Sequence, residues 1–98
     1  MQTSLQKENN QLIISVSGRV DTTTAPELEK TIFDNLDGIA ELILDLKDMP
    51  YTSSAGLRVF LKAQKAMENQ GEMKLINVAD DVMEVFDMTG FTDILTIE

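Results

Sequence analysis

Two adjacent serines, Ser53 and Ser54, are the residues whose type and position most directly suggest chemistry. They precede an apolar periodic segment that begins at Leu57, so they lie where a helix is expected to start. A serine at this position can cap the helix or accept a phosphate, because free N–H groups and the helix dipole stabilise negative charge there. From local chemistry alone we favour capping by both serines, with Gly56 allowing the helix to pack closely on a sheet.

Carboxylate pairs are the only other groups in the chain that suggest catalysis, namely Asp45 with Asp48 and Asp80 with Asp81. A catalytic pair needs surroundings that separate the two pKa values, and the sequence places no base or nucleophile beside either pair. The chain has no His and no Cys, and it lacks a glycine-rich nucleotide loop. We therefore expect no enzymatic activity, no cofactor and no metal site.

The charge of the chain limits its partners. Seventeen acidic residues outnumber eight basic ones among 98, which gives a net charge of −9. Such a protein repels nucleic acid and anionic lipid, so we expect neither to bind it directly. The first ten residues are polar, unlike a signal peptide, and no apolar run approaches the roughly 18 residues of a membrane span. We expect a cytoplasmic protein.

The N-terminal half of the chain predicts two strands and a helix. Residues 12–16 are aliphatic and β-branched, and a weaker strand over residues 3–7 precedes them. Asn9-Asn10 suits a tight turn between antiparallel strands, because Asn tolerates positive φ. Thr24 and Glu27 have the spacing of a capping box, and apolar residues then recur at helical spacing as far as Leu36.

The C-terminal half alternates strands and helices. Residues 41–46 and 73–78 read as apolar strands, with a helix from the serines to Gly71 between them. Asp80 or Asp81 is expected to cap a third helix that ends at Gly90, and residues 94–97 are expected to form a last short strand. This order predicts one α/β domain over residues 1–98, with a mixed, mostly parallel sheet of four to five strands and three or more helices.

The segment from Asp45 to Leu57 resembles the signature of STAS-domain anti-sigma factor antagonists. That signature is an Asp-Leu strand end, a short loop, and then Asp-Ser-Ser/Thr-Gly-Leu at the start of a helix. Aligning Gly56-Leu57 with its Gly-Leu places Ser54 at the phosphoacceptor position. Ser53 then replaces the usual Asp, and Ala55 replaces the usual Ser or Thr.

Two further matches extend the resemblance over nearly the whole chain. Gly18-Arg19-Val20-Asp21, followed by Thr24-Ala25, is similar to the Gly-x-Leu/Val-Asp and Thr-Ala of the family. The Asp of that motif lies beside the phosphorylation site, so the resemblance assigns Asp21 to the partner surface. Residues 85–91 resemble the end of the family's third helix.

The function implied by this resemblance is partner switching. The unphosphorylated protein would bind an anti-sigma factor serine/threonine kinase, which then releases its sigma factor. Phosphorylation of Ser54 by that kinase would break the complex, and a serine phosphatase would reset it. The free protein is expected to be a monomer. Large loop side chains often anchor interfaces, so Met49 and Tyr51 join Asp21, Ser53 and Ser54 as candidate partner contacts, although both could instead belong to the core.

Two other regulatory functions compete with this interpretation. Receiver domains are also small and acidic, but Ser15-Val16-Ser17-Gly18 occupies the place where they carry an acidic pair. A STAS-domain module could also serve a stress-signalling scaffold or a lipid-transport complex without a sigma factor, because a fold does not fix a partner. The retained Ser54 favours a kinase-linked switch.

Overall fold

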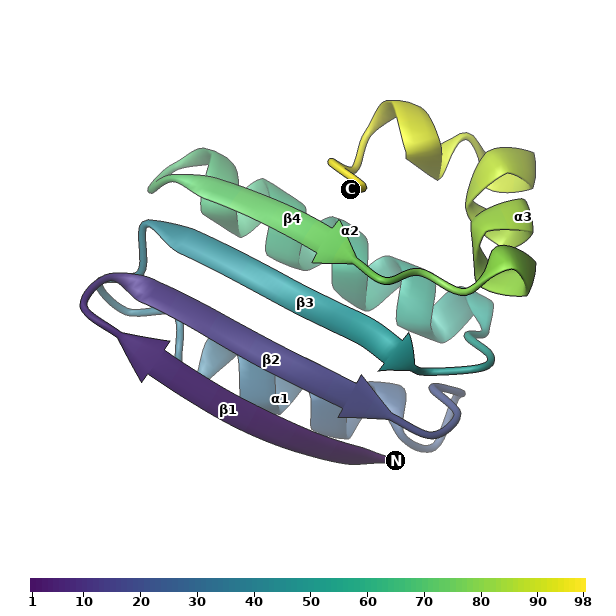
Figure 1. The fold of residues 1–98 in the computed structure, drawn as a ribbon, viewed down its shortest axis with the longest axis horizontal. Coiled ribbons are helices and arrows are strands. Elements are labelled where there is room, and N and C mark those ends of the chain that lie inside the picture. Colours follow the sequence, from purple (N-terminus) through teal and green to yellow (C-terminus); the bar gives the residue numbers. More distant parts are fainter.

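The computed structural model describes all residues 1–98 and shows a four-stranded sheet with two helices packed on one face (Figure 1). A third helix and a short 3-10 helix lie beside the end of the last strand. The elements are β1 (Gln2–Glu8), β2 (Gln11–Ser17), α1 (Ala25–Phe33), β3 (Glu41–Asp48), α2 (Ser54–Glu68), β4 (Glu72–Ile76), α3 (Asp80–Thr89) and η1 (Phe91–Asp93).

The sheet order is β1-β2-β3-β4, with one antiparallel pair and two parallel pairs. Asn9 adopts φ 55° in the turn between β1 and β2, as its side-chain type predicted. The α/β class and the mixed, mostly parallel sheet are thereby confirmed. No helix of the structure combines the length and the apolar character needed to cross a bilayer.

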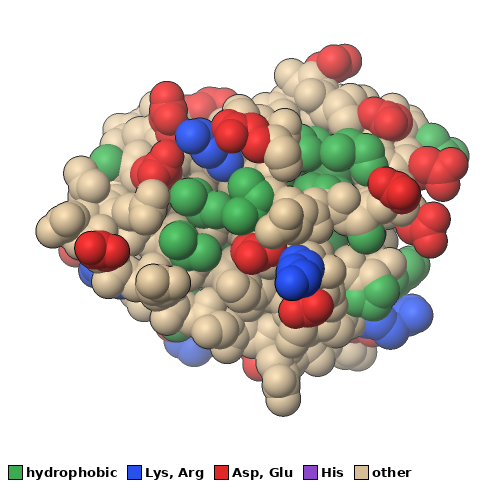
Figure 2. Space-filling model, viewed as in Figure 1, with side chains coloured by type: hydrophobic (Ala, Val, Ile, Leu, Met, Phe, Trp, Pro, Cys, Tyr) green, Lys and Arg blue, Asp and Glu red, His purple; other side chains and the backbone are tan.

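Alternation along the strands places the core between the sheet and the two helices. Every second residue of β2 and β3 is fully buried, while the residues between them face the opposite side. The core is closed by α1 and α2, and an edge-to-face contact of Phe60 with Phe86, 6.1 Å between ring centroids, joins α3 to it. Figure 2 shows the sheet face that α1 and α2 leave open, with acidic side chains gathered over α3 at the right of the view.

Two predictions about the C-terminal region are wrong. The expected strand at residues 94–97 is a single bridge between Leu75 and Ile97, because η1 takes up Phe91–Asp93 and Ile94 still has helical backbone angles. The sheet therefore has four strands. Neither Asp80 nor Asp81 caps α3, since both lie within its first turn, after the N-cap residue Ala79. Their charges can still favour the helix dipole.

Candidate functional site

Two loops lie side by side beyond the carboxyl ends of β2 and β3 (Figure 1). The N–H of Gly18 donates to the carbonyl of Asp48 at 2.9 Å, and the N–H of Val20 donates to that of Tyr51 at 3.1 Å. The N–H of Ser53 in turn donates to the carbonyl of Val20 at 2.8 Å. Backbone pairing thus continues past the sheet and fixes the loop after β2 against the segment that enters α2.

The two serines at the start of α2 have different environments. Ser53 is the N-cap residue, with extended backbone angles, and its Oγ accepts the N–H of Ala55 at 3.2 Å. Ser54 is the first residue of the helix, and its exposed hydroxyl makes no hydrogen bond within the protein. The prediction that both serines cap α2 is therefore right for Ser53 and wrong for Ser54.

Gly56 sets how closely α2 approaches the two loops. A Cβ atom at Gly56 would lie 2.1 Å from the Oγ1 of Thr52 and 2.9 Å from a methyl carbon of Val20, both closer than van der Waals contact allows. Thr52 and Val20 are buried and form the bridge between the two loops. The absence of a side chain at Gly56 thus lets the start of α2 approach the loop that carries Asp21. The sequence predicted close packing at this glycine but placed it on the sheet, whereas the contacts are with the two loops.

Asp21 organises the start of α1. Its Oδ1 accepts the backbone N–H of Thr23 at 3.0 Å and of Thr24 at 3.1 Å, and it also accepts the hydroxyl of Thr23 at 2.7 Å. In return the Oγ1 of Thr24 accepts the N–H of Asp21 at 2.9 Å. These reciprocal bonds resemble those of a capping box and lie in the turn just before α1.

Thr24 is the N-cap residue of α1, as predicted, but the predicted box between Thr24 and Glu27 does not form. Thr24 has helical backbone angles and its side chain makes no cap bond to the first turn of α1, since it is already committed to Asp21. All the hydrogen bonds to the Asp21 carboxylate go to Oδ1, which leaves Oδ2 without a hydrogen bond in the protein. The hydroxyl of Thr23 and the N–H of Thr24 lower the pKa of Asp21 below its ordinary value of 3.8, so the carboxylate is charged at neutral pH.

Met49 and Tyr51, the two proposed loop anchors, occupy different places. The Met49 side chain is completely buried, because the turn closed by its N–H and the carbonyl of Leu46 directs it into the core. The prediction that Met49 contacts a partner is therefore wrong, because a partner cannot reach this side chain in the folded protein. Tyr51 remains 41% exposed, and the guanidinium of Arg19 lies 4.3 Å from the centre of its ring. No pattern in the sequence indicates this pairing.

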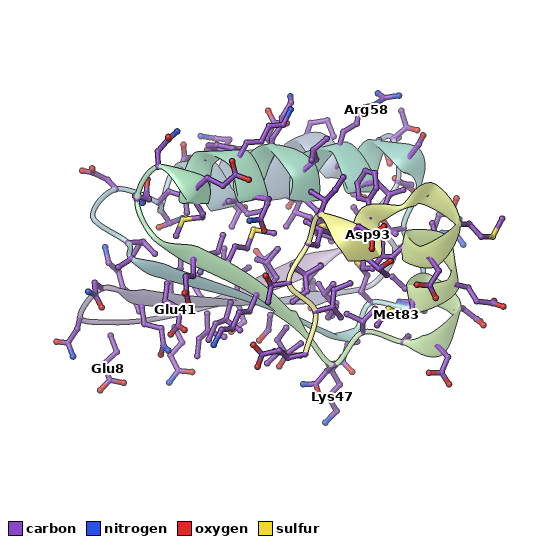
Figure 3. The ribbon with its side chains drawn as sticks, turned by 90° about the horizontal axis from the view of Figure 1, so that it is seen from above. Glu8, Glu41, Lys47, Arg58, Met83 and Asp93 are labelled. Carbon is purple, nitrogen blue, oxygen red and sulfur yellow. The ribbon has the colours of Figure 1, made fainter.

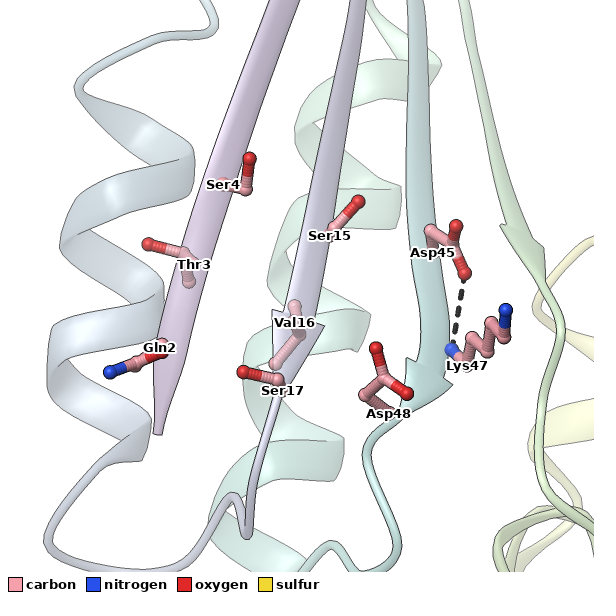
Figure 4. Close-up of a pocket in the computed structure, with 9 residues that line it drawn as sticks. All are labelled: Gln2, Thr3, Ser4, Ser15, Val16, Ser17, Asp45, Lys47 and Asp48. Carbon is pink, nitrogen blue, oxygen red and sulfur yellow. Dashed lines mark hydrogen bonds between the residues drawn. The ribbon is translucent and has the colours of Figure 1, made fainter.

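The carboxylates Asp45 and Asp48 line a polar hollow on the open face of the sheet, and neither Ser53 nor Ser54 takes part in it (Figure 4). Asp45 Oδ1 accepts the N–H of Lys47 and the side-chain amide of Asn77, both at 3.1 Å. Most of the other side chains that line the hollow come from β1 and β2 and carry a hydroxyl or amide group. No group of three or more carboxylate side chains gathers anywhere in the structure in a way that could hold a metal ion.

Comparison with known proteins identifies the class to which this fold and site belong. The model of the STAS domain matches residues 2–98. The anti-sigma-B factor antagonist of Bacillus subtilis is 32% identical over 94 residues, covering 95% of this chain and 86% of that protein. The antagonist of the same name from Listeria monocytogenes is 31% identical over 96 residues, covering 95% and 83%. The chain therefore belongs to the STAS-domain family of anti-sigma factor antagonists.

Solved structures share the fold at lower identity. An anti-sigma factor antagonist from Mycobacterium paratuberculosis superposes with a TM-score of 0.88 at 22% identity, covering 98% of this chain and 83% of that one. The Bacillus cell fate determinant SpoIIAA in its phosphorylated form superposes with a TM-score of 0.77 at 16% identity, covering 99% and 91%. The sheet with helices on one face is thus the shared STAS architecture.

Proposed function

We propose that this protein, when unphosphorylated, binds an anti-sigma factor serine/threonine kinase and thereby frees a sigma factor, and that phosphorylation of Ser54 ends the interaction. The observation that carries the proposal is the state of the Ser54 hydroxyl, which is exposed, makes no hydrogen bond and stands at the N-terminus of α2. A kinase can reach such a hydroxyl without unfolding the helix. Ser53, by contrast, is held by its cap bond.

The proposed partner surface surrounds that hydroxyl. It comprises Asp21, Tyr51, Ser53 and Ser54, which the pairing of the two loops brings together. Tyr51 supplies an exposed aromatic ring of the kind that anchors interfaces, and Asp21 supplies a carboxylate with one free oxygen. The buried Met49 contributes only by supporting the loop.

Phosphorylation is proposed to act by charge and bulk at the interface and to leave the fold intact. A phosphate on Ser54 would sit at a helix N-terminus, where the dipole favours a negative charge by roughly 0.3–1 kcal/mol. At the interface the same group adds about −1.5 to −2 charges close to the ionised Asp21, and it must be desolvated there. The phosphate therefore opposes binding far more than it perturbs the helix.

Two features of the relatives support this proposal. The matched relatives are named antagonists of an anti-sigma factor, which implies an anti-sigma factor partner. SpoIIAA, which shares the fold, has been solved in unphosphorylated and phosphorylated forms. In the proposed cycle the chain is a monomeric substrate and binding protein that catalyses nothing, and a serine phosphatase restores Ser54. Because sigma factors act with RNA polymerase, the cycle takes place in the cytoplasm.

The proposal is tested by purifying the tagged protein from its native cells and identifying copurified kinases. The kinase is then incubated with ATP and the wild-type, Ser53→Ala and Ser54→Ala proteins, and the phosphate is mapped by mass spectrometry. We expect modification of wild type and Ser53→Ala at Ser54 and none of Ser54→Ala. A phosphate on Ser53, or recovery of a scaffold or transport complex without an anti-sigma factor, would overturn the proposal.

The extent of the partner surface is tested on the same kinase. Asp21→Ala and Tyr51→Ala should each lower its affinity while circular dichroism shows a native fold. Met49→Leu, which keeps the buried volume, serves as the control and should bind like wild type. Wild-type affinity in both surface variants would place the interface elsewhere.

A further inference from the structure

The charges of this acidic protein are unevenly distributed among its helices. Three of its eight basic residues, Arg58, Lys62 and Lys65, lie in α2, which holds only one acidic residue, Glu68. Helix α3 shows the opposite pattern, with four acidic residues and no basic one. The basic side chains of α2 therefore form a local positive surface on a chain of net charge −9.

These three residues share the outer side of α2. They recur at intervals of four and three residues, which places them in one row along the helix, and all three are exposed. Figure 3 shows Arg58 projecting from α2 into solvent, away from the sheet. We call Arg58, Lys62 and Lys65 the basic ridge.

A shallow groove between α1 and α2 runs beside the ridge. Ala25, Pro26, Ala55 and Val59 line it together with the polar or charged residues Thr22, Glu29, Arg58 and Lys62. Lys62 reaches Glu29 of α1 at 3.0 Å, an exposed ion pair that a stronger anion can replace at little cost. The groove also includes the neighbour of Asp21, Thr22, so it adjoins the proposed partner surface.

Arg58 is the ridge residue closest in sequence to the phosphoacceptor. It follows Ser54 by four residues, which places their Cβ atoms roughly 5–6 Å apart on one side of the helix. Side chains in a helix lean toward its N-terminus, so the guanidinium can reach a phosphate on Ser54. Arg58 makes no ion pair in the structure, and its fork of donors suits phosphate and carboxylate groups equally.

We propose that the basic ridge docks an acidic surface of the protein partner, and that a phosphate on Ser54 disables the ridge by pairing with Arg58. This inference rests on the proposed function and adds that the surface presented by the partner must be acidic. Unphosphorylated protein offers the partner three free or exchangeable cations beside the groove between α1 and α2. Phosphorylated protein has lost Arg58 to its own phosphate and presents that negative charge instead.

The docking part of the proposal is tested with the copurified anti-sigma kinase and the variant R58Q/K62Q. Removing exposed charge pairs should lower affinity roughly two- to fivefold each, so the double variant should bind about tenfold more weakly near 0.1 M salt. Its affinity should also fall less steeply with rising salt than that of wild type. Lys7→Gln, which removes one cation from the edge strand β1, is the charge control and should bind like wild type.

The phosphate part is tested with a thermodynamic cycle that adds Ser54→Asp to wild type and to R58Q. If the negative charge acts through Arg58, it should weaken binding at least threefold less in the R58Q background. If Ser54→Asp weakens binding equally in both backgrounds and R58Q/K62Q binds the kinase like wild type, the basic ridge plays no part in docking. The proposed function would then still stand. If Ser54→Asp weakens binding in neither background, both the ridge proposal and the proposed function are wrong.

A readout without any partner isolates the pairing of Arg58 with the phosphate. Protein carrying phosphoserine at position 54 is titrated by phosphorus NMR, with and without R58Q. Pairing with Arg58 should lower the second phosphate pKa, normally about 6, by roughly 0.2–0.7 units relative to R58Q. The same titration curve for both proteins contradicts the pairing.

Discussion

The guanidinium of Arg19 lies 4.3 Å from the centre of the Tyr51 ring and so joins the two loops that surround the site. Arg19 follows β2 and Tyr51 follows β3, and the carbonyl of Tyr51 also accepts the N–H of Val20. The contact covers part of an aromatic ring that is 41% exposed. It therefore holds the proposed anchor in one orientation before a partner arrives.

A double-mutant cycle measures this contact. Arg19→Ala and Tyr51→Ala should each lower the free energy of unfolding, with a coupling energy of about 0.5–1 kcal/mol, as is typical of an exposed cation–π pair. Urea titrations of the two single variants and the double variant give the coupling. Arg19→Lys, which keeps the charge but loses the planar stack, should retain only part of it. Strictly additive effects would show that the two side chains do not interact in solution.

Gly56→Ala tests whether close approach of α2 positions the site. Alanine normally stabilises a helix relative to glycine by about 1 kcal/mol, but here its Cβ would meet Thr52 and Val20 at contact distances that are too short. We expect the clash to prevail and to destabilise the protein by roughly 1–3 kcal/mol. Thermal unfolding reveals the sign directly. A higher melting temperature would mean that the packing has room for a methyl group.

The different roles of the two serines predict different stabilities for their alanine variants. Ser53→Ala removes the N-cap bond of α2 and should cost about 1 kcal/mol of unfolding free energy. Ser54→Ala removes no hydrogen bond and places a better helix former in the first turn, so stability should stay within about 0.5 kcal/mol. Chemical unfolding of both variants provides the comparison. Equal losses would contradict the assignment of Ser53 as the cap.

Much of the fold could be predicted because its determinants are local. Apolar runs marked β2 and β3, helical spacing of Leu57, Phe60 and Met67 marked α2, and Asn9 marked the hairpin turn. The start of α1 after Thr24 was predicted correctly, but its side-chain bonds were not, because Thr24 bonds to Asp21 and not to the first turn of the helix. This bond depends on the backbone after Val20, which is set by its long-range pairing with Tyr51 and Ser53.

The candidate site was predicted less completely than the fold. Ser53, Ser54 and Asp21 were placed by motif, whereas Met49 was misplaced because a loop methionine suits a core and an interface equally well. The contact of Arg19 with Tyr51 joins residues from different loops and leaves no periodic signal in the sequence. Only the packing of the whole domain decides which loop side chains remain exposed.

Asp21 predicts a pH dependence of stability. Its pKa is lowered below 3.8 in the folded protein by its bonds to Thr23 and Thr24, so the folded state favours the charged form. Its contribution is therefore complete above the pKa of the unfolded chain and is lost as pH falls through the lower, folded value. Asp21→Asn should flatten the loss of stability on acidification below about pH 4.

Carbon NMR of the Asp21 carboxyl group checks the pKa itself, and urea unfolding at a series of pH values checks the stability. Asp37→Asn is the matched control, because Asp37 is exposed and makes no side-chain hydrogen bond, so this variant should keep the full pH dependence. An Asp21 pKa at or above 3.8 would contradict the capping geometry.

The switch at Ser54 is tested most directly by titration calorimetry of the copurified anti-sigma kinase with wild type, Ser54→Ala and Ser54→Asp. The negative charge should weaken binding at least about tenfold, which needs only about 1.4 kcal/mol, while Ser54→Ala binds like wild type. Circular dichroism should show the same fold for all three proteins. Equal affinity of Ser54→Asp and Ser54→Ala for the kinase would contradict the account.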